Sequence, residues 1–317
     1  MTKTVAVIGA TGLQGSSVLK TLHATPGYRV RGVTRRPGGE AAQALAAQCP
    51  DAEWVQGDLN DAGSLAAAFR GADVVFGVTD FFQPDVLARV AAGDQDAEFA
   101  QGRNIVDAAI AARVALVVWS GLPSAARLSG GKYPGVLHFE GKHRVAEYLR
   151  SKSGQIDGLV VHVGFYMENY TRFARLSPET GDGRTVEFAF PLRPDTRLPL
   201  TDTASDVGPV VRHMLAHPDQ FRGAPAVVVS GGDRAAREMA AAFTEATGRP
   251  ARFVQIPYDA LGSDELAQMF RFLDEFGYFG HDAPDTSNAV DGYSFTTPLE
   301  FWKRRGWTGP VQPPAAS

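Results

Sequence analysis

The first half of the chain alternates short apolar runs with longer segments whose apolar residues recur at helical spacing. Apolar runs without polar alternation are typical of strands buried on both faces. They predict strands over residues 5–8, 28–34, 54–56, 73–78, 115–119 and 158–163. The helical spacing predicts helices over residues 15–24, 40–48, 62–69, 94–112 and 138–150. Strands joined by crossovers of this length predict an α/β fold with a doubly wound parallel sheet of the Rossmann type.

The second half of the chain has a less regular pattern. Residues 178–199 carry four prolines and a short strand-like piece at 186–190. Further helices are expected over residues 206–216, 233–247 and 263–276, and strands over 226–230 and 252–256. We therefore predict a Rossmann domain over residues 1–165, a smaller α+β lobe over 166–309 that returns one strand to the main sheet, and a flexible tail over 310–317.

Composition and charge narrow the classes of function. Hydrophobic residues make up 44% of the chain, and the net charge of −4 gives no basic surface for nucleic acid. Cys49 is the only cysteine, which excludes an intramolecular disulfide and a cysteine-based zinc site. His213 and His217 lie four residues apart, but no glutamate follows His213 and Pro218 ends the segment. We therefore expect no metal site.

No apolar run approaches the roughly 20 residues that span a bilayer. The run before the first glycines is also too short for the core of a signal peptide. We therefore expect a cytoplasmic protein with no membrane partner.

The first strand leads directly into the sequence Gly9-Ala-Thr-Gly-Leu-Gln-Gly15. In a dinucleotide-binding turn, Gly9 would allow the tight turn, Gly12 the approach of a pyrophosphate, and Gly15 the close packing of helix on strand. The N–H groups at the start of the helix would then face the phosphates. The alternative is an ordinary glycine turn, but its place between the first strand and the first helix favours a nucleotide site.

The end of the second strand indicates which dinucleotide is bound. An acidic residue there would hold the ribose hydroxyl of NAD, but the sequence reads Gly32-Val-Thr-Arg35-Arg36. Guanidinium groups suit a 2′-phosphate. NADP(H) is therefore the expected cofactor, with Arg35 the first candidate and Arg36 the second. The alternative is a solvated arginine pair.

Two further segments follow strands. Asp58 could accept a hydrogen bond from the adenine amino group with Leu59 packing on the ring. Asp58 could also cap the next helix, either instead of this contact or together with it. Residues 79–81 leave the fourth strand at its carboxyl end, where open α/β sheets bind ligands.

Together these motifs resemble those of the NmrA-like proteins, which are atypical short-chain dehydrogenase/reductases. The resemblance covers roughly residues 3–307 and includes motifs at residues 9–15, 33–37, 57–61, 78–82, 119–122, 138–142, 165–169 and 266–272. Within the family, the motifs resemble the animal NADPH-sensor branch more than the fungal nitrogen regulator.

The resemblance implies a Rossmann fold, NADP(H) binding and, in many members, a homodimer. It implies cofactor contacts from Gly9, Thr11, Gly12, Leu13, Gln14, Gly15, Arg35, Asp58, Leu59, Thr79, Asp80, Phe81, Lys142, Gly164, Phe165, Tyr166 and Met167. One departure is that the sensor branch has a lysine where this chain has the segment around Ala100 and Arg103.

The residues for chemistry differ from those of ordinary short-chain dehydrogenases. Those enzymes use Tyr-x-x-x-Lys, whereas this chain reads His138-Phe-Glu-Gly-Lys142. Lys142 can still hold the nicotinamide ribose. His138 is either a proton donor or a structural residue at a helix start. Tyr166 is a second candidate donor, or a cover for the nicotinamide ring, and Ser120 either orients substrate or lies in a turn.

Two functions follow from this pattern. We place first an NADP(H)-responsive sensor that controls a protein partner, because a complete cofactor site lies beside a missing catalytic tyrosine. The alternative is an NADPH-dependent reductase of a quinone, an imine or a similar unsaturated molecule. Aromatic residues near the expected cleft would suit a small planar substrate, although they could equally belong to the core.

Overall fold

The main sheet is a single layer of seven parallel strands. The computed structural model describes residues 2–280, 290 and 292–311. The strand order is β11-β6-β5-β4-β1-β2-β3, and every neighbouring pair is parallel. The strands are β1 (Lys3–Ile8), β2 (Tyr28–Thr34), β3 (Glu53–Gln56), β4 (Val74–Gly77), β5 (Leu116–Gly121), β6 (Asp157–Val163) and β11 (Val227–Val229). The predicted Rossmann-type α/β fold is confirmed.

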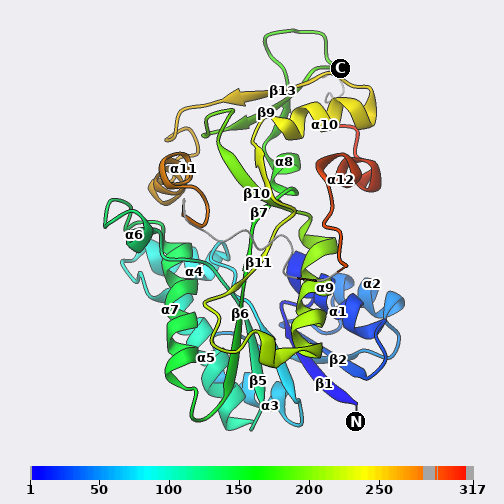
Figure 1. The fold of residues 1–317 in the computed structure, drawn as a ribbon, viewed down its shortest axis with the longest axis vertical. Helices are drawn as coiled ribbons and strands as arrows, with labels where there is room; N and C mark the ends of the chain where they lie inside the picture. The colour runs from blue at the N-terminus through cyan, green and yellow to red at the C-terminus, as the bar shows by residue number, and fades with distance from the viewer. Residues whose placement is uncertain (1, 281–289, 291, 312–317) are drawn as a thin grey trace.

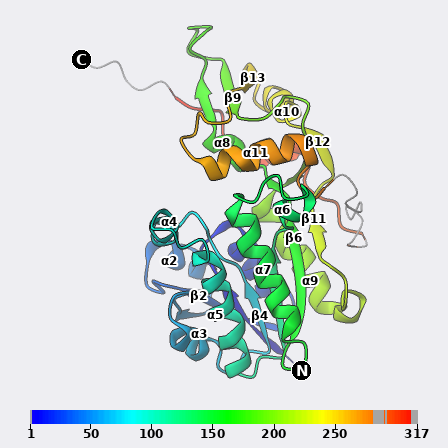
Figure 2. The ribbon, with the colours of Figure 1, turned by 90° about the vertical axis from the view of Figure 1, so that its left-hand side faces the viewer.

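Helices cover both faces of this sheet, as Figures 1 and 2 show. In β1, Val5 and Val7 point to the face covered by α1 (Leu13–His23) and α9 (Thr203–Ala216). Ala6 and Ile8 point to the opposite face, under α3 (Ala62–Phe69), α5 (Ala97–Ala111) and α7 (Leu137–Ser151). The side chains alternate between two cores, which explains why the strand reads as one apolar run. A further helix of the first half is α2 (Glu40–Gln48).

The chain returns to the main sheet late in the sequence. Helix α9 packs on α1, where the backbone N–H of Gly208 donates to Ser17 Oγ at 3.0 Å. A Cβ at Gly208 would lie 2.2 Å from Thr21 Oγ1. β11 then pairs with β6 at the sheet edge. These two elements therefore pack with the first half of the chain. The proposed division at residue 165 stays a prediction.

The upper part of Figure 1 is a second lobe with two three-stranded sheets, β12-β10-β7 and β13-β9-β8. Its core is aromatic: Phe188, Phe190, Phe243, Phe270 and Trp302 are all buried. Its elements are β7 (Phe165–Tyr166), α8 (Asn169–Arg172), β8 (Ala174–Leu176), β9 (Val186–Phe190), β10 (Arg197–Thr201), β12 (Asp233–Ala235), α10 (Glu238–Thr247), β13 (Ala251–Gln255), α11 (Asp264–Phe276) and α12 (Pro298–Arg305).

Several element boundaries differ from those expected. The helix predicted from residue 233 begins at Glu238, because residues 233–235 pair with β10 as an antiparallel strand. The long helix predicted from residue 94 begins at Ala97, since the Asp94 carboxylate is held in a turn by Arg89. Helix α4 (Pro84–Ala91) and the short α6 (Ala125–Leu128) had no predicted counterpart. Residues 312–317 of the expected tail lie outside the described residues.

A buried carboxylate in the second lobe should make stability depend on pH. Burial opposes ionisation of Glu187, but hydrogen bonds from Arg252, Ser177 and Arg175 outweigh it and lower the pKa of Glu187 below its ordinary 4.5. A lowered folded-state pKa stabilises the protein above about pH 4.5 and loses this effect as the pH falls. We expect Glu187→Gln to reduce the free energy of unfolding by about 1–3 kcal/mol at pH 7. Urea unfolding at pH 7 and pH 3.5 should show the difference shrink at the lower pH; a constant difference would contradict this.

Candidate functional site

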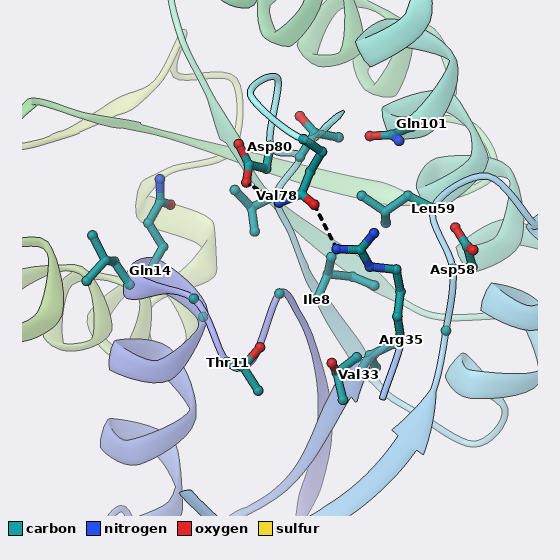
Figure 3. Close-up of a pocket in the computed structure, with 18 of the residues that line it drawn as sticks. Ile8, Thr11, Gln14, Val33, Arg35, Asp58, Leu59, Val78, Asp80 and Gln101 are labelled. Atoms are coloured by element: carbon teal, nitrogen blue, oxygen red, sulfur yellow. Dashed lines mark hydrogen bonds between the residues drawn. The ribbon is translucent and has the colours of Figure 1, made fainter. Parts of the chain in front are cut away.

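A cavity of about 420 Å³ opens at the carboxyl ends of β1, β2 and β4 (Figure 3). Its volume is in the range of small-molecule sites, and open α/β sheets bind ligands at this edge. The lining comprises Ile8, Gly9, Thr11, Gly12, Leu13, Gln14, Gly15, Val33, Thr34, Arg35, Gly57, Asp58, Leu59, Asn60, Val78, Thr79, Asp80, Gln83, Asp85, Gln101 and Tyr166. The structure thus brings together many of the residues predicted to bind cofactor.

The glycine turn forms the floor of this cavity. Gly9 has φ +61°, a left-handed conformation that favours glycine. A Cβ on Gly15 would lie 2.2 Å from the carbonyl oxygen of Gly9, so only glycine lets α1 start this close to β1. Gly12 is the N-cap of α1, and no side chain caps this end of the helix. The first backbone N–H groups of α1 are therefore available to a ligand. This arrangement suits an anion such as a pyrophosphate.

The two arginines after β2 lie in different surroundings. Arg35 extends across the cavity toward the segment that carries Asp80 (Figure 3), and its Nη2 donates to Gln83 Oε1 at 2.7 Å. Gln83 in turn donates to Asp80 Oδ2 at 2.6 Å. Arg36 is exposed and is not among the residues that line the cavity. Of the two candidates, the geometry favours Arg35.

Asp58 lines the cavity and does not cap the following helix. The N-cap of α3 is Asp61, whose Oδ1 accepts from the backbone N–H groups of Gly63 and Ser64 at 2.9 and 3.1 Å. Asp58 Oδ1 accepts only a local bond from the Asn60 N–H at 2.9 Å among the interactions described. The capping alternative is therefore wrong, and the Asp58 carboxylate remains available to a ligand.

A chain of hydrogen-bonded polar side chains lies at the end of the cavity opposite Arg35 and Asp58 (Figure 3). Ser120 Oγ donates to Gln14 Oε1 at 2.6 Å, and Gln14 Nε2 donates to the Tyr166 hydroxyl at 2.5 Å. Burial raises the pKa of Tyr166 to about 12. The phenol therefore stays protonated at neutral pH and is a weaker acid than a free tyrosine.

Lys142 is held by a carboxylate that the sequence did not single out. Its Nζ donates to Glu98 Oε1, which also accepts from Thr79 Oγ1 at 2.8 Å. Glu98 is only 2% exposed, and its other carboxylate oxygen has no partner among the described residues. Lys142 does not itself line the cavity, but it is linked to the cavity wall through Thr79.

His138 lies one helical turn from Lys142, at the contact between the two lobes. Its Nδ1 is paired with Glu265 at the start of α11. The rings of Phe81 and Phe82 have their centroids 5.8 and 5.5 Å from that of His138. Glu265 is the second functional candidate that sequence reasoning missed. Its place in a helix first turn gave only the signal of a helix-dipole carboxylate.

The remaining candidates lie outside the cavity lining. A Cβ on Gly164 would meet the carbonyl oxygen of Pro199 at 2.0 Å, so this glycine serves the packing of β7 on β10. Phe165 and Met167 are buried in the aromatic core of the second lobe, and Phe81 packs in a small cluster with Val86. Contacts of these four residues with a cofactor stay predictions. Lining residues that were not predicted to contact the cofactor include the polar side chains of Asn60, Gln83, Asp85 and Gln101.

The fold and this cavity define a Rossmann-type protein with a glycine turn and a cavity at the carboxyl edge of its parallel sheet. Residues 1–309 match the sequence profile of the NmrA-like family. The chain belongs to the NmrA-like family.

Three comparisons place the chain among known proteins. It is 31% identical to the NmrA-like family domain-containing oxidoreductase FrzB of Cladobotryum sp., over 92% of this chain and 90% of FrzB. The structure of NmrA, a negative transcriptional regulator, in complex with NADP shares 25% identity and a TM-score of 0.71, over 97% of this chain and 92% of NmrA. The NADPH complex of the quinone oxidoreductase QOR2 from Escherichia coli has a TM-score of 0.68 over 95% and 99% of the two chains; at 22% identity it shows the fold alone.

One part of the expected resemblance finds no support. The motifs indicated the animal NADPH-sensor branch, whereas FrzB and other curated relatives that match the chain are fungal. Short motifs shared by the whole family carry too little information to separate its branches. Within the described residues, no helix is long and apolar enough to cross a membrane.

Proposed function

We propose that the protein binds NADP(H) in this cavity and is an NADPH-dependent reductase of an unsaturated small molecule. The observation that carries the proposal is the combination, in one cavity, of a glycine turn at a helix N-terminus with Arg35 at the end of β2. The first relative reported above is named an oxidoreductase, and NmrA is solved with NADP.

The residues present fit a dinucleotide. The free N–H groups at the start of α1 would hold the pyrophosphate, which a Cβ on Gly15 would prevent. Arg35 would hold the 2′-phosphate, while Asp58 and Leu59 would contact the adenine. When bound, the cofactor supplies a hydride. Arg36 is the weaker candidate for the phosphate because it lies away from the cavity lining.

Lys142 would hold the ribose next to the reacting end. Glu98 fixes the ammonium from one side, and the Thr79 hydroxyl ties Glu98 to the cavity wall. A preorganised cation at this place would orient the nicotinamide without further rearrangement. Tyr166 and Ser120, joined through Gln14, would exclude water and cover the ring.

The preference for NADPH over NADH should depend on Arg35. Replacing Arg35 with alanine removes a charge-assisted hydrogen bond to phosphate, worth about 1.5–3 kcal/mol, and should weaken NADPH binding about 10–100-fold. NADH binding should change little, because NADH lacks the 2′-phosphate. Fluorescence titration of both cofactors measures this. Arg36→Ala is the matched control, and an equal loss in both variants would contradict the assignment.

A sensor function is the second candidate, and one contact favours it. His138 stands where ordinary reductases have a tyrosine, and its ring is tied to Glu265 of the second lobe. Cofactor bound against Lys142 would then influence the position of α11 and a partner-binding surface, or the dimer state. Limited proteolysis tests this: cleavage that is the same without cofactor, with NADP⁺ and with NADPH would speak against a sensor.

A further inference from the structure

The contact between His138 and Glu265 joins two residues that are far apart in the sequence. His138 lies in the first turn of α7 and Glu265 in the first turn of α11. The two side chains are 11% and 12% exposed, so the pair is largely shielded from water. Glu265 Oε1 also lies 3.4 Å from the backbone N–H of His138, which fixes the carboxylate at the start of α7.

The chemistry of the pair sets the direction of its hydrogen bond. A carboxylate can only accept, so the hydrogen lies on His138 Nδ1. This leaves Nε2 as the ring nitrogen that can exchange a proton with another molecule. The second oxygen, Glu265 Oε2, is buried and has no partner among the described residues. The imidazole of His138 is therefore the main side chain to which the Glu265 carboxylate is hydrogen-bonded.

The surroundings of His138 suit a flat molecule. The Phe81 and Phe82 rings both lie against the imidazole, and Phe82 is 40% exposed, so its ring is accessible to a planar ligand. Asp80, the neighbour of Phe81, lines the cavity. Lys142 lies four residues along α7 on the same helix face. A planar substrate between the phenylalanines and the cavity would meet both the ribose-holding lysine and the histidine.

We propose that His138 is the proton donor of the reductase proposed above, that Glu265 is its positioning residue, and that the substrate is a planar carbonyl compound such as a quinone or an aromatic aldehyde. This inference rests on the proposed function. A reductase of cationic acceptors would need no such pair, because hydride addition alone neutralises a cation. A carbonyl acceptor develops negative charge on oxygen and needs a proton.

The step balances in atoms and charge. A hydride from NADPH forms a C–H bond at the carbonyl carbon, or at the ring system of a quinone, and the π electrons move to oxygen. The protonated imidazole of His138 gives its Nε2 proton to that oxygen. The ring is left neutral with its hydrogen on Nδ1, held by Glu265, and takes a new proton from water. One NADPH, one proton and one carbonyl give NADP⁺ and the reduced, hydroxyl-bearing product.

The test compares two acceptors with opposite proton demands, 9,10-phenanthrenequinone and a cationic triphenylmethane dye. We expect His138→Gln to lower kcat for the quinone about 100-fold or more, with the affinity for NADPH and the rate with the dye unchanged. Glu265→Met, which cannot accept a hydrogen bond, should lose quinone reduction in the same selective way, and Glu265→Gln should recover part of it. Free imidazole should partly restore quinone reduction by a His138→Gly variant.

Glu275→Gln is the matched control. Glu275 is on the same helix and also joins the lobes, through Tyr133 and Lys132, but it does not touch His138. If the pair only holds the lobes together, Glu275→Gln and Glu265→Met should both lose turnover with the quinone and with the dye to the same extent. That result would overturn the inference. Nitrogen-15 NMR gives a readout without turnover: the His138 hydrogen should lie on Nδ1 in the natural protein and on Nε2 in Glu265→Met. An identical tautomer in both would overturn the positioning role.

The failures of the two proposals are distinguishable. Turnover of the quinone that survives both His138→Gln and Glu265→Met would overturn the dyad and leave the reductase standing. A natural protein that binds NADPH but oxidises it with neither acceptor would overturn the reductase, and the donor role with it.

Discussion

Replacing Lys142 with methionine is expected to abolish turnover and to destabilise the protein by about 3–5 kcal/mol. The ammonium is the charged partner of Glu98, which is 2% exposed and keeps only the Thr79 hydroxyl once the lysine is gone. A buried carboxylate without its cation is costly in free energy. Turnover should be lost because nothing else described near Thr79 can hold the ribose with a charge. Urea unfolding and NADPH oxidation measure the two effects.

The double variant Lys142→Met with Glu98→Gln separates these effects. It removes both charges, so most of the lost stability should return. Turnover should not return, because the cation is still absent. A double variant that is as active as the natural protein would contradict the role of Lys142, and one that is as unstable as the single variant would contradict the ion pair.

Replacing Gly15 with alanine is expected to weaken cofactor binding. The new Cβ would lie 2.2 Å from the Gly9 carbonyl oxygen and 2.6 Å from its carbon, both backbone atoms of the tight turn. Neither atom can yield without moving the first turn of α1, so the N–H groups would no longer face the phosphates. We expect the free energy of unfolding to fall by about 3 kcal/mol, and the affinity for NADPH to fall at least about tenfold, equivalent to the loss of one charge-assisted hydrogen bond.

Gly208→Ala is the control for this prediction. Its Cβ would collide at 2.2 Å with Thr21 Oγ1 and at 2.3 Å with the carbonyl oxygen of Ser17, on a part of α1 that lies away from the cavity. It should therefore lower stability without a comparable loss of NADPH affinity, measured by titration under conditions where each variant is folded. Equal losses of affinity in both variants would show that Gly15 acts through stability alone.

Features that depend on residues close together in the sequence could be predicted best. The strand at residues 5–8 could be predicted because both faces of the parallel sheet are covered and the run is continuously apolar. The glycine turn could be predicted because each glycine answers a local requirement, of which the collision at Gly15 is the clearest. Each of these two features depends on residues that are only a few positions apart in the sequence.

Contacts between distant segments could not be predicted. Glu98 meets Lys142 across 44 positions, and Glu265 meets His138 across 127. No spacing rule links such residues, since their meeting depends on how α5, α7 and α11 pack. The choice between Arg35 and Arg36 is a similar case: the sequence offered two adjacent guanidinium groups, and only the direction of the chain after β2 places one of them at the cavity.

The most direct test of this account follows NADPH oxidation at the nicotinamide absorbance, with a panel of quinones, imines and aldehydes. Lys142→Ala serves as the control. We predict substrate-dependent oxidation of NADPH that the variant loses. Tight binding of NADPH with no oxidation across the panel would contradict the reductase and favour the sensor.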